Sequence, residues 1–484
     1  MLFSSITFLY YFLPPVLALY FAPDLAERFL SGGKLHAARS GRPGMGKNVV
    51  LLLGSLIFYA WGEPRYVFLM GVSILSGYFF GLLLEKYRGG KAGRIFCLLS
   101  VGISLSFLLY FKYGNFFLEN LGALTGHKLP LIQAALPIGI SFYTFQIISY
   151  TLDVYRGERA EKNPVNLAAY ISMFPQLIAG PIVRYAGIAG QMRERRHSWE
   201  EASAGVRRFV AGLAKKILLA NQLGELCGAF RASAEKAVLF YWLYAIALAL
   251  QIYFDFSGYS DMAIGLGRVL GFQFLENFNY PYISASITEF WRRWHITLGS
   301  WFRDYVYIPM GGNRVGKARW LFNIFVVWML TGFWHGAAWN FIIWGLYFAV
   351  LLMAEKLWLL KYLKKSRVMS RLYVLFLVMV SFVIFNGENM PQAFSDIGGL
   401  FGAGGIPLVS AEALYYLRSF GVLLICGVVG ATPAAKGLLG RLFQKPAGRK
   451  ILFVAEPVVL LALMAVMTAY LVDGSFNPFL YFRF

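Results

Sequence analysis

Charge is scarce in this sequence, and acidic charge is the scarcest. Of 484 residues only 14% are charged, with 24 acidic side chains against 45 basic ones. Soluble proteins carry roughly 25% charged residues, so the composition excludes an ordinary soluble globular protein. Hydrophobic residues make up 58% of the chain. Several runs approach the roughly 20 apolar residues that cross a bilayer. We therefore expect an all-α polytopic membrane protein in contact with membrane lipid.

The sequence also has little that could hold a metal or a redox group. Its three cysteines, Cys97, Cys227 and Cys426, stand apart without Cys-x-x-Cys spacing, and its five histidines are widely dispersed. Nucleophile-elbow, P-loop and His-Glu-x-x-His motifs are missing too. We expect no bound cofactor and no metal site, and we interpret the cysteines as small apolar packing residues.

The net charge of +21 could indicate a nucleic-acid partner. The basic residues, however, fall in clusters between apolar runs, as the positive-inside bias of membrane proteins predicts. We therefore expect no nucleic-acid partner. The first apolar run has no basic segment before it and no cleavage site after it, so it is predicted to be an uncleaved span.

The apolar runs predict about 11–12 transmembrane helices within a single integral membrane domain, 1–484. The candidate spans are 4–22, 47–62, 66–85, 93–111, 137–154, 237–254, 258–271, 319–334, 338–357, 372–388, 411–430 and 451–471. Basic residues collect in alternate loops. If these loops are cytoplasmic, all the crossings alternate consistently and both termini lie on the outer side.

Three further segments do not look like spans. Residues 199–224 and 284–308 mix aromatic and basic side chains, which is typical of amphipathic helices at the membrane surface. Residues 173–185 are apolar but broken by two prolines and a glycine. Non-helical backbone at membrane depth is tolerated only where protein or water satisfies it, so this segment is predicted to be re-entrant and to line a cavity.

Two histidines stand at costly positions. Trp294-His295 lies in one of the amphipathic segments, and Trp334-His335 ends an apolar run. An ionisable residue in such a place is a candidate for function. Imidazole can act as acid or base near neutral pH, so we interpret the pair as evidence for a membrane-embedded enzyme.

Four motifs carry a family resemblance. Residues 175–185, 253–262, 290–295 and 332–336, the last reading Gly-Phe-Trp-His-Gly, resemble the bacterial membrane-bound O-acyltransferase (MBOAT) family. The closest branch is that of the alginate O-acetyltransferases (AlgI-like). The resemblance implies a catalytic core over 137–357 around a tunnel that an acyl thioester enters from the cytoplasm.

The resemblance also implies the catalytic residues. His335 matches the central catalytic histidine of the family and is our predicted general base. His295 matches a second histidine, which would orient the thioester or hold the oxyanion. Either histidine could instead be structural. The residues expected along the tunnel are Trp334, Trp294, Arg292, Asp255, Asp261, Gln176 and Arg184.

Asp255 and Asp261 leave two interpretations open. They could line the tunnel and orient a histidine or Arg292, or they could hold a broken helix together. The C-terminal aromatic tail, 472–484, is equally open. It could be an interfacial aromatic belt, or it could fold back so that Tyr481 accepts the acyl group and relays it outward.

The predicted function is transfer of acetyl groups from cytoplasmic acetyl-CoA across a bacterial cytoplasmic membrane, for O-acetylation of an extracytoplasmic polysaccharide. The cytoplasmic arginines suit the phosphates of acetyl-CoA, although an acidic carrier protein is not excluded. We expect an outer SGNH-type or AlgJ/AlgX-like partner, because no part of the sequence looks able to grip a polymer. The alternatives are D-alanyl transfer to teichoic acid, peptidoglycan O-acetylation, and, in a different class, transport of a lipid-linked sugar.

Overall fold

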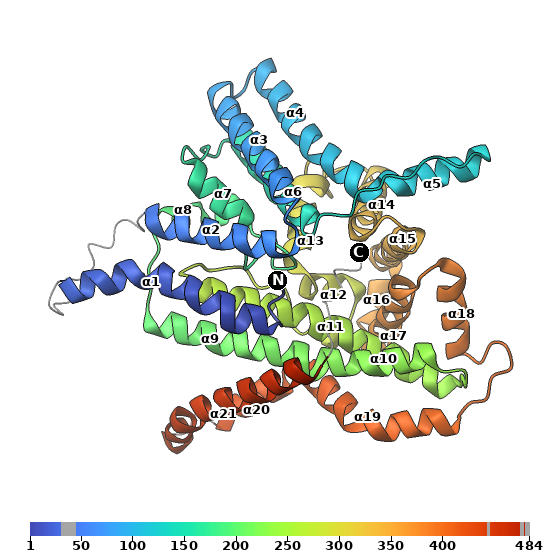
Figure 1. Cartoon of the computed structure of the whole chain (residues 1–484). Coiled ribbons are helices and arrows are strands. Elements are labelled where there is room, and N and C mark those ends of the chain that lie inside the picture. The colour runs from blue at the N-terminus through green and yellow to red at the C-terminus, as the bar shows by residue number, and fades with distance from the viewer. Residues whose placement is uncertain (31–44, 443–445, 475–478, 480–484) are drawn as a thin grey trace. The chain divides into compact units, whose positions relative to one another are not determined.

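The computed structural model describes residues 1–30, 45–442, 446–474 and 479, and these residues form helices and loops without a β-strand (Figure 1). Backbone contacts divide the chain into two compact units. The first comprises 1–209 and 260–275, and the second comprises 210–259 and 276–484. The predicted single domain over 1–484, with its core at 137–357, remains a prediction.

Eight helical stretches among the described residues are long and apolar enough to cross a membrane. They are Met45–Gly62 (α2), Val67–Lys86 (α3), Lys91–Thr125 (α4, Lys91–Leu108, continued through η2, Leu109–Tyr113, and α5, Gly114–Thr125), Val238–Val269 (α11), Trp339–Leu363 (α15, Trp339–Ala354, continued through η6, Glu355–Leu359, and α16, Leu360–Leu363), Arg367–Asn386 (α17), Ala411–Gly430 (α19) and Phe453–Asp473 within α21 (Pro446–Asp473). The prediction of an all-α polytopic membrane protein is confirmed.

The number of spans differs from the twelve expected runs in four places. The runs 4–22, 137–154 and 319–334 fall on helices that are shorter or less apolar than a full span, and 237–254 and 258–271 belong to one helix, α11. An even number of crossings, eight as much as twelve, would return the chain to the side on which it began. The distribution of basic loops then decides which side that is.

The first unit is built around α6 (Ile140–Arg156), which packs against α3 and α4. Its first twelve residues, 140–151, are all buried, which is typical of a helix surrounded by protein. Polar side chains pair inside this group, as Ser100 and Thr151 do at 2.9 Å between their hydroxyl oxygens. The remaining helices of this unit are η1 (Thr7–Phe12), α1 (Leu13–Leu30), α2, η2, α5, α7 (Pro164–Ser172), α8 (Tyr185–Arg193) and parts of α9 (Trp199–Ala214) and α11.

The chain between α7 and α8 is non-helical, as its prolines predict. Protein atoms of the same unit satisfy its backbone: the Phe174 amide donates to the Ser55 hydroxyl at 3.0 Å, and the Tyr170 hydroxyl donates to the Val183 carbonyl oxygen at 2.9 Å. This is the condition under which irregular backbone survives among membrane spans. The predicted lining of a cavity by this segment remains a prediction.

A long helical stretch runs antiparallel to α11 and includes the predicted amphipathic segment 199–224, whose place at the membrane surface remains a prediction. It consists of α9, the π-helical turn η3 (Lys215–Asn221) and α10 (Gln222–Ala232). Glycines allow the close approach: a Cβ on Gly205 would lie 2.6 Å from the Gly265 carbonyl oxygen, and one on Gly258 would lie 2.7 Å from that of Gly212. The amphipathic pattern of 199–224 thus reflects packing against a neighbouring helix, which produces the same one-sided pattern as a membrane surface.

The expected break in the chain at residues 254–258 is absent. α11 continues from Val238 to Val269, and Asp255, Ser257 and Ser260 are buried within it. The polar residues that suggested a break therefore face protein. They do not interrupt the helix, because helix hydrogen bonding uses only the backbone.

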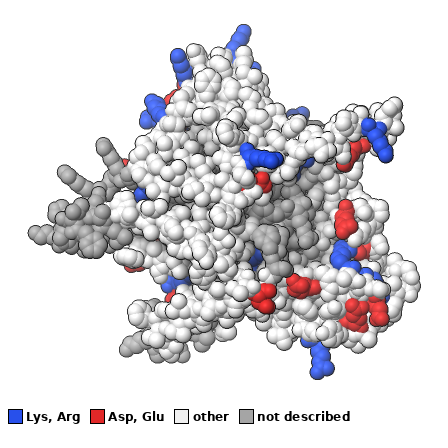
Figure 2. Space-filling model, in the orientation of Figure 1, with Lys and Arg blue, Asp and Glu red and all other residues white. Residues whose placement is uncertain are grey.

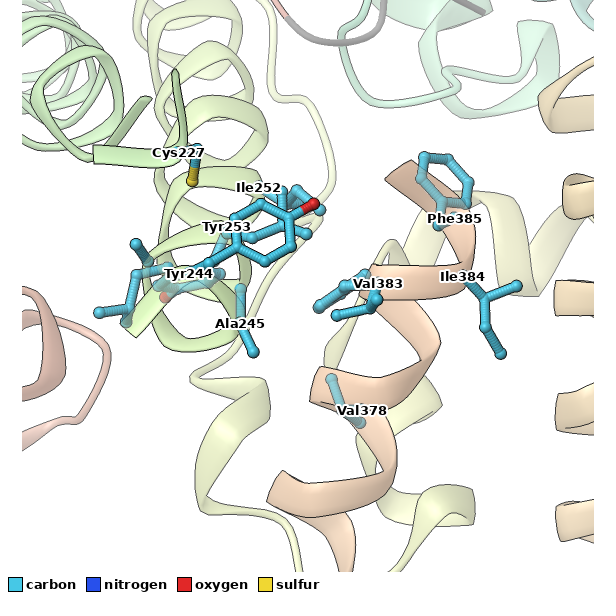
Figure 3. Packing of buried hydrophobic residues seen from close by; sticks show 14 of the residues in the cluster. Cys227, Tyr244, Ala245, Ile252, Tyr253, Val378, Val383, Ile384 and Phe385 are labelled. Atoms are coloured by element: carbon cyan, nitrogen blue, oxygen red, sulfur yellow. The ribbon is translucent and has the colours of Figure 1, made fainter. Parts of the chain in front are cut away.

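The second unit has an apolar core between α11 and α17. Tyr244, Ala245 and Tyr253 of α11 lie opposite Val378 and Val383 of α17 (Figure 3). Cys227 of α10 belongs to the same cluster, which agrees with its expected role as an apolar packing residue. The other elements of this unit are the end of α9, η3, η4 (Pro281–Ile283), α12 (Ile287–Arg293), α13 (Ile296–Phe302), η5 (Arg303–Tyr307), α14 (Lys317–His335), α15, η6, α16, α18 (Met390–Leu400), α19, α20 (Ala434–Leu442) and α21.

The surface carries few charges. In the face seen in Figure 2 most described atoms belong to uncharged residues, and the charged side chains form small separate groups. Many large apolar side chains of α19 and α21 are exposed, such as Val422 at 75% and Leu461 at 71%. Such surfaces are suited to lipid contact rather than to water.

Candidate active site

His295 lies in the bend between α12 and α13. Its backbone is left-handed, with φ of 44°, at the cap position that precedes Ile296. This conformation is uncommon for a residue other than glycine and costs of order 1–3 kcal/mol, so the surroundings must enforce it. The Ile296 amide donates to the Asn277 carbonyl oxygen at 3.0 Å, which holds the bend. The predicted amphipathic segment 284–308 is therefore broken here.

The environment of His295 favours a neutral imidazole. The side chain is only 2% exposed, and its ring meets the Phe256 ring edge-on at 4.7 Å. Burial lowers the pKa of His295 to about 3. Its Nδ1 lies 3.1 Å from Oδ1 of Asn277, whereas its Nε2 has no hydrogen-bond partner among the described residues. At neutral pH this histidine therefore has a proton on only one ring nitrogen.

His335 is the last residue of α14 and is 5% exposed. Its ring contacts Trp344 of α15 at 5.0 Å and Phe385 of α17 at 5.2 Å, both edge-on. The preceding turn approaches α15 very closely, because Gly332 and Gly345 meet without side chains; a Cβ on Gly332 would lie 3.0 Å from the Cα of Gly345. The absence of a side chain at both glycines thus allows the two helix backbones to approach each other.

Trp334 brings the two histidines together. Its ring centre lies 5.9 Å from that of His295 and 4.9 Å from that of His335. Residues forty positions apart in sequence thus flank one buried indole. This arrangement places two imidazoles in a single buried aromatic environment. Because little water reaches it, a proton transferred there must be taken up or released by the side chains and the substrate.

Two other residues of the motif around His295, both expected along the tunnel, lie in different surroundings. Trp294 is buried in an aromatic group, with Phe278 at 5.1 Å, Phe382 at 5.3 Å and Phe290 at 5.5 Å between ring centres. Arg292 is exposed on α12. Trp294 thus packs the wall next to His295, and Arg292 is available to bind an anion at the surface.

Asp255 and Asp261 pair with basic residues of the antiparallel helix. Lys216 Nζ lies 2.6 Å from the Asp255 carboxylate, and Arg208 lies 2.9 Å from the Asp261 carboxylate. The sequence left open whether these carboxylates line the tunnel or hold a broken helix together. The contacts favour a structural role, but the carboxylates join α11 to its neighbour, and α11 itself is unbroken. Each carboxylate links α11 to α9 or η3.

Gln176 and Arg184 belong to the first unit. The Gln176 side-chain amide is fully buried and donates to the Tyr170 carbonyl oxygen at 2.6 Å. Arg184 is half-buried at the cap of α8. Both residues stabilise or border the non-helical segment described above, and their place along a tunnel remains a prediction.

Tyr481 lies outside the described residues. Phe479, two positions earlier, is described and is 1% exposed. Its ring lies 4.5 Å from Lys216 Nζ and meets the Tyr259 ring edge-on at 4.8 Å. The tail is therefore anchored in protein at Phe479, beside the buried Lys216–Asp255 pair.

Sequence reasoning missed two residues that support the site. Asn277 contacts His295, and the Glu355 carboxylate accepts hydrogen bonds from the amides of Ile287 and Thr288 at the start of α12. Glu355 carries a usable signal, because it is an acidic residue within an apolar run. Asn277 carries none, since a polar residue in a predicted loop is ordinary.

Comparisons with known proteins show the family of this chain. The family model of MBOAT, membrane-bound O-acyltransferase family, matches residues 95–388. The chain is 37% identical over 519 residues to the probable alginate O-acetylase AlgI of Azotobacter vinelandii, with all of both chains covered. It is 42% identical over 412 residues to the probable alginate O-acetylase AlgI of Pseudomonas syringae pv. tomato, covering 84% of this chain and 76% of that one.

A further relative has a different named activity. The peptidoglycan O-acetyltransferase of Helicobacter pylori is 32% identical over 403 residues, covering 76% of each chain. The family match spans more than half of this chain and includes His295 and His335. The Azotobacter vinelandii relative aligns along the entire length of this chain. The protein thus belongs to the membrane-bound O-acyltransferase family, in its alginate O-acetylase (AlgI-like) branch, and is an O-acyltransferase.

Proposed function

We propose that this protein passes acetyl groups from cytoplasmic acetyl-CoA across the bacterial cytoplasmic membrane for O-acetylation of an extracytoplasmic polysaccharide, alginate or another exopolysaccharide. The observation that carries the proposal is the pair of buried imidazoles on either side of Trp334. The named activity of the alginate O-acetylase relatives supports the substrate class.

The chemistry requires a proton acceptor. As a hydroxyl oxygen bonds to the thioester carbonyl carbon, a base must take the hydroxyl proton, and the tetrahedral intermediate then expels the thiolate as the carbon–sulfur bond breaks. The thiolate recovers the proton and leaves as the CoA thiol. His335 is our proposed base, because it is buried at the end of α14 and matches the central histidine of the family.

The membrane separates the donor from the acceptor of the acetyl group. The thioester donor is cytoplasmic and the polymer lies outside, so the acyl group must cross an apolar barrier. We propose that Tyr481, on the tail anchored at Phe479, accepts the acyl group and relays it outward. An SGNH-type or AlgJ/AlgX-like outer protein then completes transfer to the sugar hydroxyl. With all twelve expected runs crossing the membrane, the basic loops favour an orientation with both termini outside.

The donor end suits acetyl-CoA. Exposed guanidinium groups on the α12 side, such as that of Arg292, bind phosphate groups through charge-assisted hydrogen bonds. A second acceptor, peptidoglycan, is favoured by one observation only, the 32% identity to the Helicobacter pylori enzyme. Both acceptors present hydroxyl groups, so the same site serves either one.

Labelled acetyl-CoA tests the proposal directly. Protein reconstituted in liposomes should consume the thioester in the presence of an acceptor, and His335→Ala should reduce turnover at least about 10²-fold, the usual contribution of a general base. His127→Ala is the matched control, because His127 is exposed and its Nδ1 bonds to the nearby Thr125 carbonyl oxygen. Movement of a lipid-linked sugar without thioester consumption would instead support a transporter.

A further inference from the structure

Asn277 is a buried connector between two segments of the second unit. Its side chain is fully buried, and its Oδ1 lies 3.1 Å from His295 Nδ1, 2.9 Å from the Thr297 hydroxyl and 3.3 Å from the Thr297 backbone nitrogen. Its own carbonyl oxygen accepts from the Ile296 amide. One asparagine therefore fixes the backbone and the side chains on both sides of the His295 bend.

The contact with Thr297 determines which end of the amide faces His295. A backbone N–H can only donate a hydrogen bond, so the Asn277 atom facing Thr297 must be the oxygen. The same oxygen faces His295 Nδ1, and an amide oxygen can only accept. His295 must then donate from Nδ1, which fixes the tautomer of the neutral ring.

The remaining nitrogen of His295 is consequently a lone-pair acceptor. Nε2 is buried and has no hydrogen-bond partner among the described residues, while the left-handed backbone at His295 holds the ring in place. A buried acceptor left unsatisfied costs about 1–3 kcal/mol, so such an atom indicates a place where a donor binds. A strained backbone around it is typical of a site that a ligand completes.

We infer that Asn277 is a positioning residue that keeps the His295 proton on Nδ1, so that Nε2 accepts the proton of a hydroxyl that attacks the thioester. The inference rests on the proposed acetyl transfer. It moves the proton-accepting role in the thioester step from His335 to His295, and His335 then acts on the hydroxyl that next receives the acetyl group. It also replaces the oxyanion-holding role expected from the sequence, because a neutral ring in this tautomer has no proton on Nε2 to donate.

The atoms balance in this step. The hydroxyl oxygen forms its bond to the acetyl carbon, and the hydroxyl proton moves to Nε2, which leaves an imidazolium with a proton on each nitrogen. The carbon–sulfur bond then breaks, and the Nε2 proton passes to the departing thiolate. Asn277 accepts the Nδ1 proton throughout, so the ring returns to its starting tautomer.

The pH profile of two Asn277 variants tests the inference. Asn277→Asp keeps an acceptor for Nδ1 and Thr297 but adds a negative charge, which raises the pKa of the imidazole. Among the described residues, the groups in contact with His295 include Phe256, Trp334 and Asn277, none of which is a carboxylate. The acidic limb of kcat/KM should therefore move to higher pH by about one unit or more.

Asn277→Ala should act differently. Without the acceptor the His295 ring can take either tautomer, so kcat should fall by about 10²-fold to 10⁴-fold while KM changes little. The upper value is the loss seen when the histidine of a catalytic triad has the wrong tautomer. Asn323→Ala is the matched control, because Asn323 is fully buried and bonds to the Gly312 carbonyl oxygen in a different loop. It should lower stability without moving the pH profile.

Nitrogen-15 spectra of histidine-labelled protein give a readout that does not depend on activity. We expect the His295 signal, assigned with His295→Gln, to show a proton on Nδ1 and none on Nε2 from pH 5 to 8. A proton on Nε2 in the wild type would overturn the inference. So would an unmoved pH profile in Asn277→Asp. If wild-type protein fails to consume acetyl-CoA but has the expected tautomer, the proposed function fails and the positioning role of Asn277 stands.

Discussion

Lys216 and Asp255 form an ion pair that lies almost entirely within protein. Each side chain is 3% exposed, and the Lys216 ammonium also lies over the Phe479 ring. Charges removed from water are tolerated only when paired, and the loss of one partner costs more than the loss of both. The pair therefore joins η3 to α11, and Phe479 of the C-terminal tail packs against it.

Lys216→Met should destabilise the protein by about 3–5 kcal/mol, because the Asp255 carboxylate loses its buried cation. The double variant Lys216→Met/Asp255→Leu should recover most of that loss. Thermal unfolding in detergent measures both. Arg208→Met is the comparison, because its pair with Asp261 is more exposed, at 21% and 17%, and should cost less. A double variant as unstable as Lys216→Met would contradict this account.

At the scale of the element, α12 is a seven-residue helix that could not persist alone. Isolated helices shorter than about 12 residues are marginal in water. Two side chains cap its N-terminus. The Ser286 hydroxyl accepts from the Glu289 amide at 3.0 Å, and the buried Glu355 carboxylate accepts from the amides of Ile287 and Thr288 at 2.6 and 2.9 Å. Glu355 thus attaches the helix that precedes Trp294 to the end of α15.

Glu355→Ala should leave two amides of α12 unsatisfied and lower stability by about 2 kcal/mol or more. It should also lower kcat, because the His295 bend begins where α12 ends. Glu355→Gln keeps an acceptor oxygen and should lose much less. Unfolding temperature and acetyl-CoA turnover, measured on the same preparations, separate the two effects. Equal losses in both variants would show that charge, rather than hydrogen bonding, is what α12 requires.

At the scale of the whole molecule, the C-terminal end of the chain packs against earlier parts of the second unit. The helix α21 is mostly exposed, yet Phe479 beyond it is buried against Lys216 and Tyr259. A surface belt would leave this ring facing lipid. The anchoring of Phe479 supports a tail that reaches protein, which is the condition for the proposed relay through Tyr481.

Tyr481→Phe removes the phenol and keeps the ring, so it should abolish acetyl transfer to an outer acceptor while the protein stays folded. Tyr470→Phe, at an exposed position of α21, should have no effect. Labelled acetyl recovered on the protein, and on the acceptor, distinguishes the steps. Unchanged transfer in Tyr481→Phe would show that the relay proposal is wrong and would leave the site at His335 untouched.

The sequence by itself determined the class of the protein, because burial in lipid demands long apolar helices and few charges whatever the packing. It also identified His295 and His335, since an imidazole among apolar residues is costly wherever it lies. The sequence could not count the spans. The polar residues Asp255, Ser257 and Ser260 resembled a break, yet a helix keeps its backbone hydrogen bonds when its polar side chains find partners on another helix.

Only the tertiary structure decided which polar groups meet. The partners of Asp255, Asp261 and His295 come from segments 18 to 53 residues away, which no local pattern specifies. The same applies to Trp334, which packs between two imidazoles that the sequence separates. Hydrophobic patterning reports what surrounds a residue on average, whereas hydrogen bonds and ion pairs depend on atoms being placed within about 3 Å of one another. That placement is set by packing of the folded chain.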